Sequence, residues 1–254
     1  MVMSSTRTRP AGLVLAVAAA AAGLVTAGCT REASPPTPVA TSQSSTPSPT
    51  PSPTQTAVDD AKTLLRMAAD DFSATDSVHF ALIGSDLPTQ GDVLVAAEGD
   101  AARPDRLKAA ATTRSDGTQL TTDVIAIGDR AWVQIPLIGT WVESDDTRLD
   151  ARMLWDDDTG VSALVREVKP TTATPAAPTS GRRVVDGTLP GAAVRGLIPG
   201  ADGTGSVGVQ VIIDTGVTAA RVVSIKLRVD LDGSRSTYLL TLSDYGKTVV
   251  IDQP

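Results

Sequence analysis

The sequence predicts an α+β fold built on one main antiparallel sheet, and two observations lead to this class. First, apolar and polar residues alternate in many short segments, which is the period of a half-buried strand. The clearest example runs from 220 to 232, where every second residue from Val223 to Leu231 is apolar. Second, the few helical patterns are grouped between runs of strands and do not alternate with them one by one. Short strands with grouped helices favour antiparallel pairing.

The N-terminal half of the folded part begins with an amphipathic helix. Between residues 57 and 72, apolar residues such as Ala61, Leu65 and Phe72 recur at helical spacing, and polar residues occupy the other side. The pattern then changes to a period of two. It predicts strands at 77–84, at 91–100 and around 107–111, followed by a hairpin over 120–136 that turns at Gly128-Asp129.

In the C-terminal half, two helices interrupt the strands. They are predicted around 147–155 and 159–168, the second just after three aspartates that suit a helix N-terminus. A loop over 169–181, a strand at Val184-Val185 and a short helix within 190–200 follow. Three closing strands complete the chain, at 207–214, 220–232 and 236–246.

A lone cysteine near the N-terminus indicates export and lipidation. Cys29 is the only cysteine of the chain, and one thiol can form neither an internal disulfide nor a zinc site. Two arginines, the apolar run 11–25 and the pair Ala27-Gly28 precede it, which is the order of a secretory signal. A cysteine at the cleavage point resembles the bacterial lipobox, which implies that residues 1–28 are a signal peptide and that Cys29 is acylated. The alternatives are an ordinary signal peptide and a transmembrane helix, although a span needs ~20 apolar residues.

The segment after Cys29 is predicted to be a tether. Residues 30–56 are almost wholly Pro, Ser, Thr and other small or polar residues, and such a segment cannot bury enough apolar surface to order itself. Residues 29–56 are therefore expected to form a lipidated, disordered tether. Residues 57–254 are then one domain with a sizeable core. We expect this domain at the outer face of the plasma membrane, in the cell envelope.

Charge and motifs argue against several classes of function. The chain carries a net charge of −7, and removal of residues 1–28 takes away two arginines and no acid, so nucleic acid is not an expected partner. The segment 203–208 matches G-x-G-x-x-G but precedes a strand, which makes it a turn. The segment 156–167 resembles a calcium loop in its acidic residues, but Val161 stands at the position where such a loop requires glycine. The single histidine, His79, lies within a strand pattern. We therefore expect no catalytic residues, no metal and no cofactor.

Side-chain size is more informative than any motif. The chain has only three Trp, two Tyr and two Phe, although 41% of its residues are hydrophobic. A strand face with Leu107, Ala109 and Ala111 beside Val93 and Val95 carries small side chains, and packing at interior density needs bulk from elsewhere. Either helices lie close on this face, or it stays open and something apolar fills it. Composition alone leaves both alternatives open.

Several segments, taken together and in order, resemble the mycobacterial lipoprotein family of LppX and LprG. They are SVHF at 77–80, TWVESDD at 140–146, MLWDDDTGVSALV at 153–165, LIPGA at 197–201 and SDYGK at 243–247. The resemblance implies a fold similar to Lol-type carriers, namely a strongly curved antiparallel half-barrel with helices across its concave face, enclosing an apolar cavity. It also implies a ligand, a multiply acylated lipid or glycolipid moved across the envelope, in some cases beside an efflux transporter.

Together with the apolar strand faces, the resemblance predicts which residues line the cavity. A lipid carrier must cover acyl chains, since each exposed CH₂ costs about 0.8 kcal/mol, and a mostly apolar cavity does this. The alternative is a surface-tethered scaffold or interaction module with a packed interior. The candidate lining residues are Phe80, Leu82, Val93, Val95, Leu107, Ala109, Val124, Trp132, Leu164, Leu197, Val211, Ile213, Leu227 and Leu240.

Overall fold

A computed structural model describes residues 53–145, 150, 152–177, 180–216 and 219–254. The predicted signal peptide, Cys29 and most of the predicted tether lie outside these residues. The elements are α1 (Pro53–Ser73), β1 (Ser77–Ser85), β2 (Val93–Ala102), β3 (Arg106–Ser115), β4 (Thr118–Ile127), β5 (Arg130–Gln134), β6 (Trp141–Ser144), α2 (Val161–Glu167), β7 (Lys169–Pro175), β8 (Arg182–Pro190), the 3₁₀ helix η1 (Gly191–Val194), β9 (Ser206–Thr215), β10 (Ala220–Leu231) and β11 (Ser234–Ser243).

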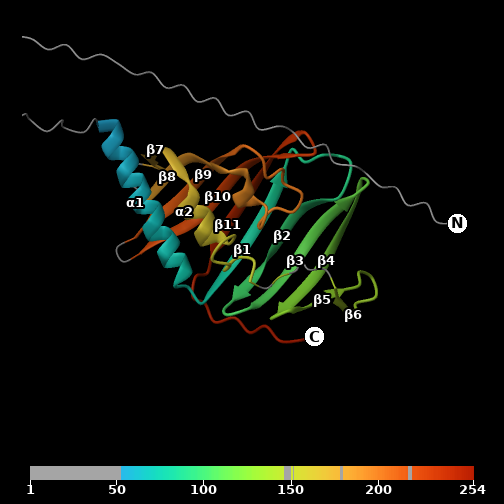
Figure 1. The fold of residues 1–254 in the computed structure, drawn as a ribbon. Coiled ribbons are helices and arrows are strands. Elements are labelled where there is room, and N and C mark those ends of the chain that lie inside the picture. Colours follow the sequence, from blue (N-terminus) through green and yellow to red (C-terminus); the bar gives the residue numbers. More distant parts are fainter. Residues whose placement is uncertain (1–52, 146–149, 151, 178–179, 217–218) are drawn as a thin grey trace, which may run out of the picture. The chain divides into compact units, whose positions relative to one another are not determined.

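The described strands form one 11-stranded sheet in the order β6-β5-β4-β3-β2-β1-β11-β10-β9-β8-β7. Every neighbouring pair is antiparallel. The two ends of the order, β6 and β7, do not pair, so the sheet is curved but unclosed (Figure 1). The predicted α+β class and antiparallel sheet are confirmed.

Both α-helices lie on one face of the sheet. The main contacts of α1 are with α2, β7 and β10, and α2 contacts β8 and η1. In Figure 1 the helices therefore cover the half of the sheet formed by β7–β11 and leave the half formed by β2–β5 without a helix. We call the covered side of the whole sheet the helix-bearing face.

The predicted helix at 57–72 is confirmed as α1, and its apolar side faces the sheet. Ala61, Leu65 and Phe72 are each at most 2% exposed. The helix begins at Pro53, inside the predicted tether, because proline suits the first turn, where a backbone N–H has no intrahelical partner. At the other end, the Phe72 ring stacks on Trp155 with 4.8 Å between centroids, and this contact fixes the helix against the loop 152–160.

Two predicted elements are corrected. The segment 169–181 was expected to be a loop because of its prolines, but Lys169–Pro175 is the edge strand β7. An edge strand tolerates proline because one of its sides needs no backbone donor. The predicted helix around 147–155 lies partly outside the described residues. Of its described residues, 150 has no regular structure and 152–155 form a turn.

Two β-bulges change which residues face the core. Between Leu94 and Ala96 the β2–β3 register shifts, so Leu94 joins the helix-bearing face and Val93 pairs opposite Arg114 on the other face. Between Val222 and Ser224 the β9–β10 register shifts in the same way. As a result, Val222 is fully buried and Val223 only half-buried. A bulge inserts one residue and inverts the alternation that a sequence pattern assumes.

Gly99 allows β2 and β3 to approach closely. A Cβ at this position would lie 2.1 Å from the Lys108 carbonyl oxygen and 2.7 Å from the Ala109 Cβ. No side chain fits at such distances, so only glycine permits this pairing where the sheet bends.

A second, smaller apolar cluster lies on the opposite face. Trp132 pairs with Ile125 across β5 and β4, and both pack with Ile251 of the C-terminal segment. The Arg106 guanidinium donates to the Ile251 carbonyl oxygen, which ties that segment to the sheet.

The two tyrosines make folding sensitive to high pH. Burial raises the pKa of Tyr238 to about 12 and also raises the pKa of Tyr245, and their hydroxyls donate to the Leu94 and Val222 carbonyl oxygens. Because the unfolded pKa is 10.0, the tyrosines contribute stability that is complete below pH 10 and lost as pH rises toward 12.

We therefore expect the urea midpoint to fall between about pH 9 and about pH 11.5. The Tyr238→Phe and Tyr245→Phe variants, which are less stable at neutral pH, should show a smaller fall of the urea midpoint over this range. An equal loss in the wild type and in both variants would assign the effect to other groups.

Candidate functional site

Ten of the fourteen predicted lining residues lie together in the main apolar cluster between the sheet and the helices. Leu164 belongs to α2, Leu197 follows η1, and the others come from the strands. The ten are Phe80, Leu82, Leu107, Ala109, Leu164, Leu197, Val211, Ile213, Leu227 and Leu240. Those of the β7–β11 half are at most 2% exposed, so helices and sheet pack directly against one another there.

The other four lie elsewhere. Val124 is buried opposite Ala109 in the β3–β4 register, and so shares the helix-bearing face. Val95 is the half-buried extra residue of the β2 bulge. Val93 and Trp132 lie on the opposite face, Val93 because of that bulge and Trp132 because it pairs with Ile125. These two do not line the helix-bearing face.

Small side chains make up the helix-bearing face of β2–β4, and their burial decreases along the strands. Leu107 is 6% exposed and Ala109 9%, Ala111 is half-buried, and Leu120, at the turn between β3 and β4, is 50% exposed. This strip, which also includes Ala97 and Val124, is therefore closed near Leu107 and opens toward the turn.

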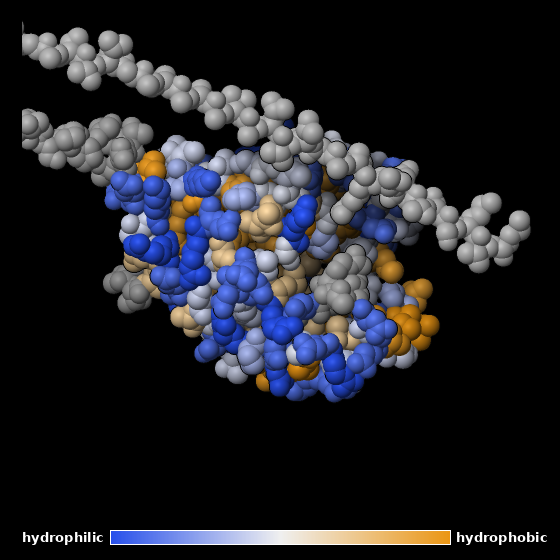
Figure 2. Space-filling view, in the orientation of Figure 1, coloured by the Kyte–Doolittle hydropathy of each residue, from blue (hydrophilic) through white to orange (hydrophobic). Residues whose placement is uncertain are grey.

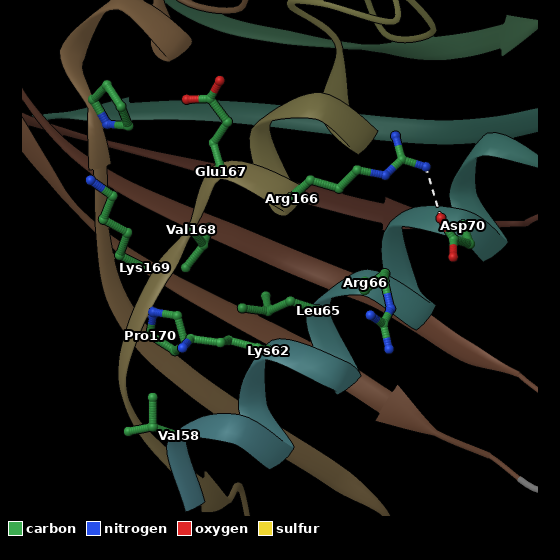
Figure 3. Close-up of a pocket in the computed structure, with 11 residues that line it drawn as sticks. Val58, Lys62, Leu65, Arg66, Asp70, Arg166, Glu167, Val168, Lys169 and Pro170 are labelled. Carbon is green, nitrogen blue, oxygen red and sulfur yellow. Dashed lines mark hydrogen bonds and ion pairs between the residues drawn. The ribbon is translucent and has the colours of Figure 1, made fainter. Parts of the chain in front are cut away.

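A groove of about 900 Å³ lies between α1 and β7. Figure 3 shows Leu65 pointing from α1 toward Val168 and Lys62 pointing toward Pro170. Leu65 and Val168 are buried, at 2% and 5% exposure, and form an apolar floor. The full lining is Val58, Lys62, Leu65, Arg66, Asp70, Arg166, Glu167, Val168, Lys169, Pro170 and Pro190.

The rim of the groove is mainly basic. Two of its four cations are paired: Arg166 donates to Asp70 Oδ1 at 2.8 Å, and Lys62 Nζ lies 3.6 Å from Asp59 Oδ1. Arg66 and Lys169 form no ion pair within the described part of the chain. Glu167 also lines the groove without an ion pair among the described residues, but the lining has four cations against two carboxylates. An apolar floor below a net positive rim suits an amphipathic anion.

None of the fourteen predicted residues lines this groove. The β7 side of the groove was predicted to be a loop. The α1 side combines residues that a helical wheel places on the apolar side of the helix with residues that it places on the polar side. The available signal was the short apolar pattern Val168 and Pro170 directly after the α2 segment.

The polar residues singled out in the sequence form no chemical site. His79 lies on the face opposite the helices, with Nδ1 2.9 Å from Asp100 Oδ1. Asp156 accepts hydrogen bonds from the Thr159 hydroxyl and the backbone N–H groups of Thr159 and Asp158, which lower its pKa. It therefore caps a turn, and Gly160 takes the N-cap position of α2. In the described ranges, no three His, Cys, Asp or Glu residues are placed to hold a metal ion.

Of the helices that the structure describes, none is both long enough and apolar enough to cross a membrane.

Comparisons with known proteins give one family model and several solved structures. The family model described as LppX_LprAFG lipoprotein matches residues 60–251. The chain is similar to LprF from Mycobacterium bovis, at 20% identity and a TM-score of 0.62 over 77% of this chain and 97% of that one. It is also similar to the lipoprotein LppX from Mycobacterium tuberculosis, at 19% identity and a TM-score of 0.53 over 76% and 99%. A LolA superfamily protein from Nitrosomonas europaea gives 11% identity and a TM-score of 0.30 over 76% and 94%. No curated protein matches the sequence.

Proposed function

Because this chain belongs to the LppX_LprAFG lipoprotein family, we propose that it is a lipid-binding envelope protein that carries acylated lipids or glycolipids. The observation that carries the proposal is the groove between α1 and β7, with its apolar floor and basic rim. Its volume of about 900 Å³ is that of a ligand site. No catalytic step is part of this function.

The acyl chains lie against two apolar surfaces. One is the groove floor around Leu65 and Val168. The other is the small-residue strip of β2–β4, where Ala111 is half-buried and Leu120, near the β3–β4 turn, is 50% exposed. Covering CH₂ groups that would otherwise meet water, at about 0.8 kcal/mol each, supplies the affinity.

The headgroup lies at the rim, beside Arg66 and Lys169, which have no ion partner among the described residues. Phosphate or carboxylate oxygens accept charge-assisted hydrogen bonds from such groups. Apolar chains below and an anionic headgroup above give the ligand one orientation.

The domain works at the outer face of the membrane, held by acylated Cys29 and the tether that follows it. In this position the protein receives lipid from the bilayer or from an efflux transporter and passes it outward.

The alternative function is a tethered scaffold with a packed interior. The near-complete burial of Leu164, Leu227 and Leu240 favours this second candidate.

Mass spectrometry of retained lipid separates the carrier from the scaffold. The mature chain, residues 29–254 with Cys29→Ser to remove the anchor, is purified without detergent and extracted with organic solvent. The carrier yields stoichiometric acylated lipid, and the preparation takes up a fluorescent phospholipid from vesicles. A chain that retains no lipid and takes up none is a scaffold.

We expect Cys29→Ala to abolish acylation and the anchoring of the mature chain that depends on it. The thioether to the diacylglycerol forms at this sulfur, so its loss leaves an uncleaved precursor or releases the domain. Fractionation, metabolic labelling with palmitate and the size of the product measure the effect. If Cys29→Ala remains in membranes as a mature-sized protein, a different group anchors the chain.

A further inference from the structure

The hairpin of β5 and β6 carries apolar side chains that protrude into solvent. Leu137 is fully exposed and Ile138 is 71% exposed. Figure 2 shows an apolar patch at the place where Figure 1 draws this hairpin, at the lower right. A contiguous apolar patch at an exposed loop tip is typical of a surface that meets a protein partner or a membrane.

The loop that presents them is well defined. Ile135 N–H donates to the Thr140 carbonyl oxygen at 2.8 Å, Gly139 N–H donates to the Ile135 carbonyl oxygen at 2.9 Å, and Gln134 Nε2 donates to the Gly139 carbonyl oxygen at 3.0 Å. The loop is thus a fixed platform from which its side chains project.

Leucine is an unfavourable residue for the backbone conformation of this turn. Leu137 has φ 70°, a left-handed conformation that glycine or asparagine adopts with less strain. A strained backbone that holds a fully exposed apolar side chain is a frequent property of functional positions.

The hairpin also lacks charge. Residues 131–142 contain no Asp, Glu, Lys, Arg or His, although the chain as a whole is acidic. The charges that flank the segment neutralise each other, because Arg130 Nε and Nη2 donate to the two Glu143 oxygens at 2.7 and 2.9 Å. Trp141, at the start of β6, is half-buried against the cluster of Ile125, Trp132 and Ile251, and so holds the base of the hairpin to the sheet.

We propose that the hairpin tip, Leu137 and Ile138, inserts into the surface of a lipid bilayer and docks the domain there. A six-residue loop offers less surface than the about 800 Å² that each partner contributes to a stable protein interface, whereas two aliphatic side chains that insert shallowly into a bilayer add weak binding to that of an acyl anchor. The 23 residues between Cys29 and Pro53 reach at most ~80 Å, so an anchored chain keeps the domain within reach of a bilayer and free to turn its hairpin edge toward it. Docking rests on the proposed anchored carrier and adds to it the surface that meets the lipid.

The test uses the mature chain with Cys29→Ser, which has no acyl anchor and no other cysteine. Ile138→Cys, labelled with an environment-sensitive fluorophore, should shift to the blue when phosphatidylcholine vesicles are added. The same label at Thr174→Cys, exposed on β7 at the other edge of the sheet, should not shift. No shift at position 138 would overturn the proposal.

Vesicle partitioning gives the second measurement. Leu137→Asn combined with Ile138→Ser should lower partitioning at least tenfold and leave the fold intact, because both side chains are exposed and asparagine suits the turn. The matched control, Ile83→Thr with Leu239→Thr, removes a paired exposed couple from β1 and β11 and should change partitioning little.

Three results would overturn the proposal: no partitioning by the parent chain, equal partitioning in both double variants, or a vesicle-independent dimer that only the hairpin variant abolishes. The last would assign the tip to a second copy of the chain. Retained lipid is measured in the same preparations and should not change in the hairpin variant, so failure of docking is distinguished from failure of lipid binding.

Discussion

Ala109→Trp should lower lipid loading at least several-fold while changing the denaturant midpoint only modestly. Ala109 lies opposite Gly99 and Val124 on the helix-bearing face, in the half of the sheet where β2–β5 have no helix above them. An indole at this position occupies space that the proposal assigns to acyl chains.

Two neighbours on the same strand serve as controls. Ala110→Trp projects from the opposite face and should change neither property. Leu107→Trp enters the closed end of the strip, where Leu107 is 6% exposed, and overfilling such a site typically costs ~1–3 kcal/mol. If Ala109→Trp behaves like Leu107→Trp, and lipid loading of the folded fraction stays normal, the strip is packed core and the acyl chains lie elsewhere.

Arg66→Glu combined with Lys169→Glu should weaken binding of a fluorescent phosphatidylglycerol about tenfold, which corresponds to about 1.4 kcal/mol. These cations stand at the groove rim without an ion partner in the described residues. Reversing both replaces attraction for an anionic headgroup by repulsion, and the effect should shrink at high salt.

A neutral diacylglycerol probe should bind the double variant as it binds the wild type, because the apolar floor is unchanged. Arg228→Glu combined with Arg235→Glu reverses two exposed cations on β10 and β11. This variant matches the change in net charge and should have little effect on either probe. An equal loss for this control variant, or an equal loss of both probes, would show that the rim does not contact the headgroup.

Most of the strand arrangement was predictable because period-two alternation is a local property. The hairpin at Gly128-Asp129 and the three closing strands are where the alternation placed them. The failures have physical causes. The prolines of β7 favoured the prediction of a loop, because proline is acceptable in a strand only at the edge of a sheet. Whether a strand lies at an edge is a property of the whole sheet.

The candidate site was less predictable. Alternation identified Leu82, Leu227 and Leu240 as core-facing, and the structure buries them. It could not locate the bulge that turns Val93 away, because an inserted residue leaves the apolar pattern of a short strand unchanged. Nor could it associate Lys62 and Arg66 of α1 with Lys169 of β7, which are distant in the chain and meet only at the groove.

The sequence by itself determined the α+β class, the antiparallel pairing, the small side chains of β2–β4 and the uncharged segment 131–142, because composition and periodicity are properties of neighbouring residues. Only the tertiary structure decided that the helices cover the β7–β11 half, that Trp132 faces away from them, and that a basic groove opens beside α1. Each of these depends on which distant segments pack together, and packing is set by the curvature and register of the whole sheet.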